Sequence, residues 1–176
     1  MAGEPKGALE GLYRRPGFLI RRAQQIAVSL FLAETGALGV TNTQYGILLV
    51  LKHRPGIDQI SVAKLLGLDR STTGMVLGKL EKAGLIGRII GKQDRRRRNL
   101  ALTLAGERML DELAEPARRA QSQVLAPFTA EEQESFLHLL EKFVGTFNGS
   151  TRVPLDARGG QNERATAQPA RPRLAS

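Results

Sequence analysis

The hydrophobic positions along the chain recur mostly at spacings of three and four residues, which predicts a mainly helical fold. Residues 18–34 contain neither glycine nor proline, so they form the first predicted helix. A helix that is apolar on two sides packs on two sides, and in a chain of this length one side could belong to a second subunit. The main apolar stripe of this helix consists of Leu19, Ile20, Ala23, Ile26, Ala27, Leu30 and Phe31, and the other side carries Phe18, Val28 and Leu32.

Side chains that cap helices mark the starts of five further predicted helices. A capping side chain accepts a hydrogen bond from a backbone N–H group that the first helical turn leaves without a partner. Glycine or a Pro–Gly pair ends the first three of these helices, near residues 54–56, 67 and 84. Pro116 predicts a kink or a break in the fourth. The five capping residues are Thr41, Asp58, Asp69, Thr103 and Thr129.

Residues 58–83 have the pattern of a helix-turn-helix. Ala63 is small enough for close helix approach, Gly67 permits the turn, and Val76 anchors the second helix. The second helix begins with hydrogen-bond donors that can reach base edges and phosphates, although an ordinary helical hairpin can have the same polar start. The predicted DNA contacts of this helix are Arg70, Ser71, Thr72, Thr73 and Lys79.

A strongly basic loop lies between two short strand-like runs at 88–90 and 99–103. Residues 88–98 hold six positive side chains and one negative one, a net charge of +5. Directly after a helix-turn-helix, this arrangement predicts a β wing that lies along the DNA backbone or enters the minor groove; the alternative is a solvated loop. The predicted contacts of the wing are Lys92, Asp94, Arg95, Arg96, Arg97 and Arg98.

Composition narrows the class of protein. The 176 residues contain 26 lysines and arginines against 17 acidic residues, a net charge of +9 that favours a polyanionic partner. No cysteine and two histidines leave no disulfide, thiolate metal site or His-rich metal site, and we expect no cofactor. The longest central apolar run, residues 47–51, is too short to span a bilayer, so we expect a cytoplasmic protein.

The absence of aromatic side chains from the basic region and the absence of catalytic motifs favour a protein that binds double-stranded DNA. Residues 46–127 contain no aromatic side chain on which single-stranded bases could stack, so double-stranded DNA is the expected partner. No nucleophile–base pair or glycine-rich phosphate loop is visible, which disfavours an enzyme.

These residues and their order resemble the MarR family of bacterial winged-helix regulators. The resemblance covers residues 17–147 and rests on segments around 38–44, 65–72 and 80–86, and on the wing pattern Asp94-Arg95-Arg96 followed by Leu102-Thr103 and Gly106. It implies a homodimer, a recognition helix at 70–83 in the major groove, and Arg96, braced by Asp94, in the minor groove. Many family members have a polar or basic residue where this chain has Gly74-Met75; Gly74 could permit close approach to DNA or relieve crowding between helices.

A narrower resemblance concerns the effector. The segments 14–23 and 43–46 are similar to regulators of aromatic-acid catabolism, which implies an aromatic acid, a hydroxylated pyridine carboxylate or a CoA thioester as ligand. Such a ligand needs a cation and an apolar slot. Each of the predicted ligand residues also has a purely structural interpretation, as core aromatic, helix-terminal histidine or solvated arginine. They are Phe18, Arg22, Phe31, Tyr45 and His53.

The sequence thus predicts a mainly α protein: a winged helix-turn-helix domain with a two-stranded β wing, plus a helical dimerisation region. We expect a flexible N-terminus over 1–12, dimerisation helices within 13–40 and 104–147, the DNA-binding domain at 41–103, and a disordered basic tail over 148–176. The expected function is a dimeric repressor that binds a pseudo-palindromic operator and is released by its ligand. The alternative is an architectural protein that binds DNA without sequence preference.

Overall fold

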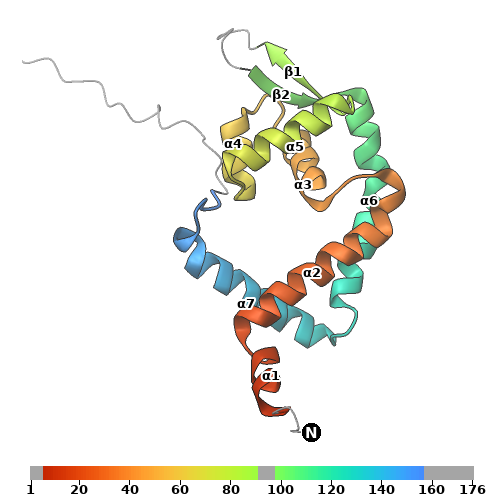
Figure 1. Ribbon diagram of the computed structural model, residues 1–176. Helices are drawn as coiled ribbons and strands as arrows, with labels where there is room; N and C mark the ends of the chain where they lie inside the picture. Colours follow the sequence, from red (N-terminus) through yellow and green to blue (C-terminus); the bar gives the residue numbers. More distant parts are fainter. Residues whose placement is uncertain (1–5, 91–97, 157–176) are drawn as a thin grey trace, which may run out of the picture.

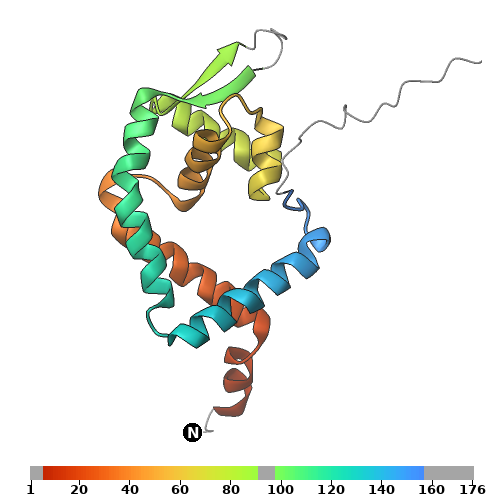
Figure 2. The same cartoon turned by 180° about the vertical axis from the view of Figure 1, so that it is seen from behind.

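The computed structural model describes residues 6–90 and 98–156, and this part of the chain is mainly helical. A compact head and a set of long helices lie at opposite ends (Figures 1 and 2). This confirms the predicted fold class. The helices are α1 (Lys6–Tyr13), α2 (Pro16–Thr35), α3 (Asn42–His53), α4 (Gln59–Leu66), α5 (Arg70–Lys82), α6 (Leu104–Leu125) and α7 (Ala130–Phe147), and the strands are β1 (Ile86–Ile90) and β2 (Arg98–Leu102).

All five predicted caps are present. Thr41 and Thr129 form capping boxes, in which the side chain of the third helical residue also accepts a hydrogen bond from the backbone N–H of the cap. Asp58, Asp69 and Thr103 each accept a hydrogen bond from a backbone N–H of the first turn of α4, α5 and α6. Local sequence therefore determines where these helices begin.

The two strands form an antiparallel hairpin at the edge of the head. Their register runs from Ile86 opposite Leu102 to Ile90 opposite Arg98, so β1 begins two residues before the predicted strand. Ile57 adds a single bridge on the other side of β2, where its carbonyl accepts a hydrogen bond of 2.9 Å from the Leu100 N–H. The hairpin is thereby attached to the segment that precedes α4.

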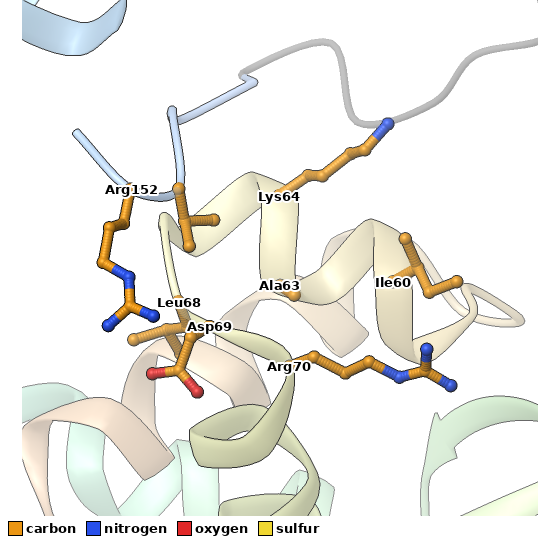
Figure 3. Close-up of a pocket in the computed structure, with 8 residues that line it drawn as sticks. Ile60, Ala63, Lys64, Leu68, Asp69, Arg70 and Arg152 are labelled. Carbon is orange, nitrogen blue, oxygen red and sulfur yellow. The ribbon is translucent and has the colours of Figure 1, made fainter. Parts of the chain in front are cut away.

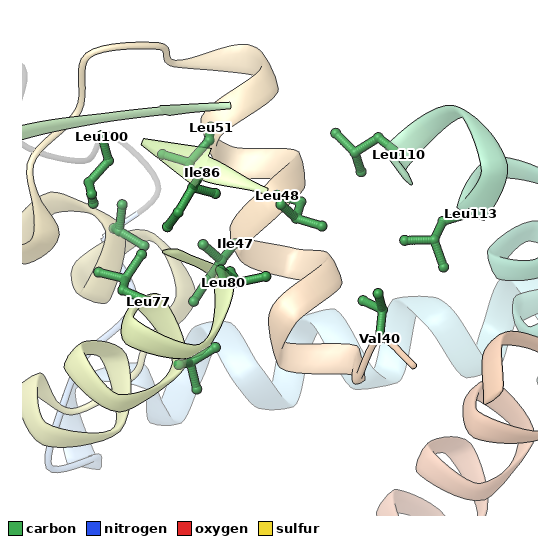
Figure 4. Packing of buried hydrophobic residues seen from close by; sticks show 12 residues of the cluster. Val40, Ile47, Leu48, Leu51, Leu77, Leu80, Ile86, Leu100, Leu110 and Leu113 are labelled. Carbon is green, nitrogen blue, oxygen red and sulfur yellow. The ribbon is translucent and has the colours of Figure 1, made fainter. Parts of the chain in front are cut away.

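The main hydrophobic core lies inside the head (Figure 4). It is built where α3, α4, α5, the hairpin and the first half of α6 meet. The head therefore has a core of its own. The buried members are Val40, Ile47, Leu48, Leu51, Val62, Val76, Leu77, Leu80, Ile86, Leu100, Leu110 and Leu113.

A second, smaller cluster joins α2 to α6. Phe31 packs there with Ala117 and Ala120, whose small side chains let the two helices approach closely. The helix α6 is continuous from Leu104 to Leu125, so of the kink or break predicted at Pro116 the break does not occur. A proline removes one hydrogen bond of the helix, and the buried alanines beyond it hold α6 against α2.

Both ends of the described chain are more ordered than the sequence predicted. Within the expected flexible N-terminus, residues 6–13 form α1, and the Tyr13 ring lies edge-on to that of Phe18 with 5.3 Å between centroids. Within the expected disordered tail, residues 148–156 return to the head, where the Asp156 N–H donates a hydrogen bond of 2.9 Å to the Lys64 carbonyl. The contact that holds residues 148–156 joins residues distant in sequence, and composition does not reveal such contacts.

In the described part of the chain, no single helix is long and apolar enough to cross a membrane. Among the same described residues, α2 with its short extension to Leu38 reaches that length and composition when taken together with α3, and the two are bent by 73°.

Candidate nucleic-acid interface

The start of α5 is fixed by Asp69. Its carboxylate accepts hydrogen bonds from the backbone N–H of Thr72 at 2.8 Å and from the Thr72 hydroxyl at 2.6 Å. The hydroxyl of Thr72 and then its backbone N–H lower the pKa of Asp69 below its usual value, so the group stays ionised. The cap thus holds the first turn of α5 in place and leaves Arg70 and Ser71 exposed in front of it.

Two of the predicted DNA contacts of α5 have structural roles, and one of them is excluded as a DNA contact by burial. Thr73 is fully buried, and its hydroxyl donates a hydrogen bond of 2.8 Å to the Asp69 carbonyl. The prediction that Thr73 contacts DNA is therefore wrong, because its side chain faces the core. The Thr72 hydroxyl is engaged by Asp69 and contributes to the cap.

The exposed face of α5 continues along the helix from Ser71 through Met75 to Lys79. Met75 is 58% exposed in the middle of this face. Met75 is not among the DNA contacts predicted from the sequence, although its position four residues after Ser71 puts both on one side of a helix. An exposed apolar side chain in a recognition helix suits contact with a thymine methyl group.

Gly74 lies against α4. A Cβ at Gly74 would come within 3.2 Å of the Gln59 side-chain nitrogen, which donates a hydrogen bond of 3.4 Å to the Arg70 carbonyl. This geometry favours the interpretation that Gly74 relieves crowding between the two helices of the motif.

The base of the wing is bound to the recognition helix by an ion pair. Arg88 in β1 donates to both carboxylate oxygens of Glu81 in α5, with its Nε at 2.5 Å from Oε1 and a terminal nitrogen at 3.1 Å from Oε2. The hydrogen bond to Glu81 raises the pKa of Arg88 above its ordinary value. Arg88 therefore orients the hairpin relative to α5, and its charge is compensated within the protein.

Most of the predicted wing contacts lie outside the described residues. These are Lys92, Asp94, Arg95, Arg96 and Arg97. Arg98 is the first residue of β2, at the end of the hairpin farthest from α6.

The structure brings together two of the five predicted ligand residues. Phe31 of α2 is 5% exposed, and its ring lies 5.6 Å from that of Tyr45 in the first turn of α3. This contact lies beside Ala117 and Ala120, where α2 and α6 meet the start of α3. Phe18 lies about 20 Å away along α2, given 1.5 Å of rise per residue, and contacts Tyr13 and Arg21 instead.

The other two predicted ligand residues lie on exposed parts of their helices. Arg22 is exposed and donates a hydrogen bond of 3.3 Å to the Gln25 side chain. His53 is the exposed last residue of α3, about 12 Å along the helix from Tyr45. In this chain, neither side chain joins the Phe31–Tyr45 contact.

A cavity of about 600 Å³ opens beside the start of α5 (Figure 3). It lies between α4, the turn that leads into α5, and the chain segment after α7. Its lining combines an apolar floor with three cationic side chains and one carboxylate. The lining residues are Ile60, Ala63, Lys64, Leu68, Asp69, Arg70, Arg152 and Val153.

Comparison with known proteins agrees with this geometry. The family model described as "MarR family" matches residues 40–97, which span α3, the helix-turn-helix and most of the wing. The homoprotocatechuate degradative operon repressor of Escherichia coli is 28% identical over 127 residues, 72% of this chain and 86% of that protein.

Two solved structures of similar proteins contain a ligand or DNA. The PcaV transcriptional regulator of Streptomyces coelicolor, in complex with its natural ligand, is 34% identical, with a TM-score of 0.68 over 82% of this chain and 98% of that one. The transcriptional repressor CouR, bound to a 23-mer DNA duplex, is 27% identical, with a TM-score of 0.71 over 77% and 96%. These are transcriptional regulators of the same fold.

Proposed function

The chain belongs to the MarR family of transcriptional regulators, and from this premise we propose that it is the repressor of an aromatic-acid catabolic operon. It binds a pseudo-palindromic operator as a homodimer. A small aromatic acid, a hydroxylated pyridine carboxylate or a CoA thioester of such an acid releases it from the DNA.

The observation that carries the proposal is the exposed polar end of α5 next to the base of the wing. Asp69 fixes the start of the helix and the Arg88–Glu81 pair fixes the hairpin beside it, so both DNA-reading elements are oriented before DNA binds. Preorganised groups lose less entropy on binding. CouR, of the same fold, is solved on a DNA duplex, which supports the same partner here.

Exposed apolar surface supports the homodimer. The described helix α7 contains no buried residue in the single protomer, and α2 exposes four large apolar side chains. Monomeric proteins rarely expose so much contiguous apolar surface. Pairing of α2 and α7 with the same helices of a second subunit would cover it. The exposed apolar residues of the two helices are Leu19, Ile20, Ile26, Leu32, Leu137, Leu139, Leu140, Phe143, Val144 and Phe147.

The Phe31–Tyr45 contact is the proposed effector site. It joins α2, α3 and α6, so a ligand that inserts there changes how the head sits on the dimerisation helices. Phe18 and Arg22 remain predicted ligand residues on the half of α2 that faces the proposed second subunit, and His53 remains one at the far end of α3. A ligand shifts the equilibrium by no more than its difference in affinity for the two forms.

The test is fluorescence anisotropy on a labelled duplex from the gene's own upstream region, with a random duplex of equal length as control. We expect tight binding to the upstream duplex only, and release by one member of a panel of aromatic acids and their CoA thioesters. Equal affinity for both duplexes, unaffected by every compound, would instead identify an architectural DNA-binding protein.

A further inference from the structure

The chain after α7 returns to the helix-turn-helix and is held there. We call residues 148–156 the C-terminal strap. The Asn148 side chain closes the strap, donating a hydrogen bond of 2.8 Å to the Leu155 carbonyl and accepting one of 2.7 Å from the Leu155 N–H. The next residue, Asp156, bonds through its N–H to the Lys64 carbonyl at 2.9 Å. The strap thus links the end of α7 to the end of α4.

The strap packs on the turn between α4 and α5. Gly67 forms this turn with a φ of 61°, and a Cβ placed on it would lie 3.6 Å from the Val153 carbonyl oxygen. The same Cβ would lie 3.9 Å from the side chain of Leu155. The strap therefore has a defined position beside the start of the recognition helix.

This position places a third cation at the start of α5. Arg152 of the strap lines the cavity of Figure 3 together with Arg70 and Lys64. Within residues 6–90 and 98–156, none of the three forms an ion pair, and the one carboxylate of the lining, Asp69, is engaged by Thr72. The rim of the cavity therefore has an excess of two positive charges.

We propose that Arg152 is a DNA-contacting residue: the strap holds its guanidinium beside the turn that leads into α5, where it binds a backbone phosphate next to the bases that α5 reads. Arg70 lies on the opposite side of the cavity (Figure 3). The proposal rests on the proposed function. A phosphate fits because the cationic rim is continuous with the exposed start of α5, and because arginine binds phosphate oxygens in a bidentate manner.

The experiment compares the salt dependence of DNA binding for the full-length protein and three variants. Arg152→Gln removes the proposed contact, and Asn148→Ala retains the charge but opens the strap. Arg14→Gln, in the turn between α1 and α2 at the far end of the molecule, is the matched control. Anisotropy is measured on the upstream and random duplexes from about 50 to 200 mM salt, the range over which phosphate contacts dominate the change in affinity.

The slope of log K against log salt is negative, and Arg152→Gln is expected to reduce its magnitude by about 0.9 per protomer, or about 2 per dimer, on both duplexes. Asn148→Ala is expected to lower it in the same direction, and Arg14→Gln to leave it unchanged. A wild-type slope for Arg152→Gln would overturn the proposal. If this variant with an unchanged slope also lost its response to an aromatic acid, the cavity would be a ligand site.

The same data separate the two proposals. If the wild-type protein prefers the upstream duplex and Arg152→Gln has an unchanged slope, only the role of Arg152 fails. If the wild-type protein shows no preference between the duplexes, the repressor function fails, while the slope on either duplex still reports whether Arg152 contacts phosphate.

Discussion

The backbone of Gly106 in the first turn of α6 lies so close to the carbonyl group of Leu85 that a Cβ on Gly106 would overlap the carbonyl oxygen. The same carbonyl accepts a hydrogen bond of 3.0 Å from the Thr103 N–H, and the Thr103 hydroxyl donates one of 2.6 Å to Gly84. The start of α6 is thereby bound directly to the residues that lead into β1. This junction sets where the wing leaves the long helix.

Gly106→Ala is therefore expected to destabilise the protein, because the added methyl group must push α6 away from the start of the hairpin. Overpacking of this kind costs about 1–3 kcal/mol, and here the obstacle is backbone, so we expect the upper part of that range. Urea unfolding measures the loss. Gly78→Ala is the matched control: a Cβ at Gly78 meets nothing within 4 Å, so it should stabilise α5 by about 0.5–1 kcal/mol. A neutral Gly106→Ala would show that the junction yields easily.

Gly106 also shows what the sequence could and could not predict. The caps at Thr41, Asp69 and Thr103 follow from side chains within three residues of their partners, so local pattern was sufficient. The reason for glycine at 106 lies in a residue twenty-one positions earlier, which no local pattern indicates. Long-range contacts of the same kind explain why the order in residues 148–156 was missed.

In the candidate site too, some features follow from local sequence and others depend on contacts between elements. The exposed start of α5 followed from the order of polar residues, whereas burial of Thr73 follows from how α5 rotates onto the core. The Arg88–Glu81 pair joins two elements that the sequence treated separately. Side chains whose role depends on the relative placement of two elements were the ones predicted wrongly or overlooked.

The contact between α2 and α6 gives a prediction for acid pH. Glu34 accepts hydrogen bonds from Arg119 at 2.7 Å and from Gln123 at 2.6 Å, and the bond from Arg119 is the main cause that lowers the pKa of Glu34 below 4.5. A carboxyl whose pKa is lower in the folded state stabilises the fold above its unfolded pKa and loses that contribution as pH falls through its folded pKa.

Glu34→Gln should therefore unfold at lower urea than the wild-type protein at neutral pH, and the difference should shrink as pH falls below 4.5. Urea titrations at neutral pH and near pH 3 measure this change. Glu112→Gln, on an exposed part of α6, is the control for loss of a carboxylate elsewhere on the same helix. If the difference in urea midpoint between Glu34→Gln and the wild-type protein stays constant down to pH 3, ionised Glu34 does not stabilise the fold.

The exposed face of α7 predicts the effect of a charge in the dimer interface. Phe143 is 46% exposed in the protomer, and its ring lies 5.2 Å from that of Phe147 on the same face. Phe143→Glu would bury a carboxylate in an apolar interface, so we expect the dimer dissociation constant to rise about 100-fold or more, equivalent to about 2.7 kcal/mol. Analytical ultracentrifugation measures it.

Leu104→Glu provides the control for this experiment. Leu104 is 63% exposed at the other end of the fold, where α6 begins beside the wing, and a glutamate in a first helical turn is tolerated well. It should leave the dimer intact. If both variants dissociate, or neither does, α7 is not the dimer interface.

The exposed end of α5 predicts two different effects on DNA recognition. Arg70 at the start of the helix is placed to read a base edge, so Arg70→Ala should lower affinity for the upstream duplex by about 1–3 kcal/mol and affinity for a random duplex by less. Lys79, about two and a half turns later, is placed for a phosphate, so Lys79→Ala should lower both affinities equally and reduce the magnitude of the salt slope by about 1 per protomer. Anisotropy on the two duplexes distinguishes these outcomes. An equal loss on both duplexes for Arg70→Ala would assign Arg70 to the backbone as well, and sequence readout would then fall to Ser71 and Met75, the remaining exposed side chains in the first half of α5.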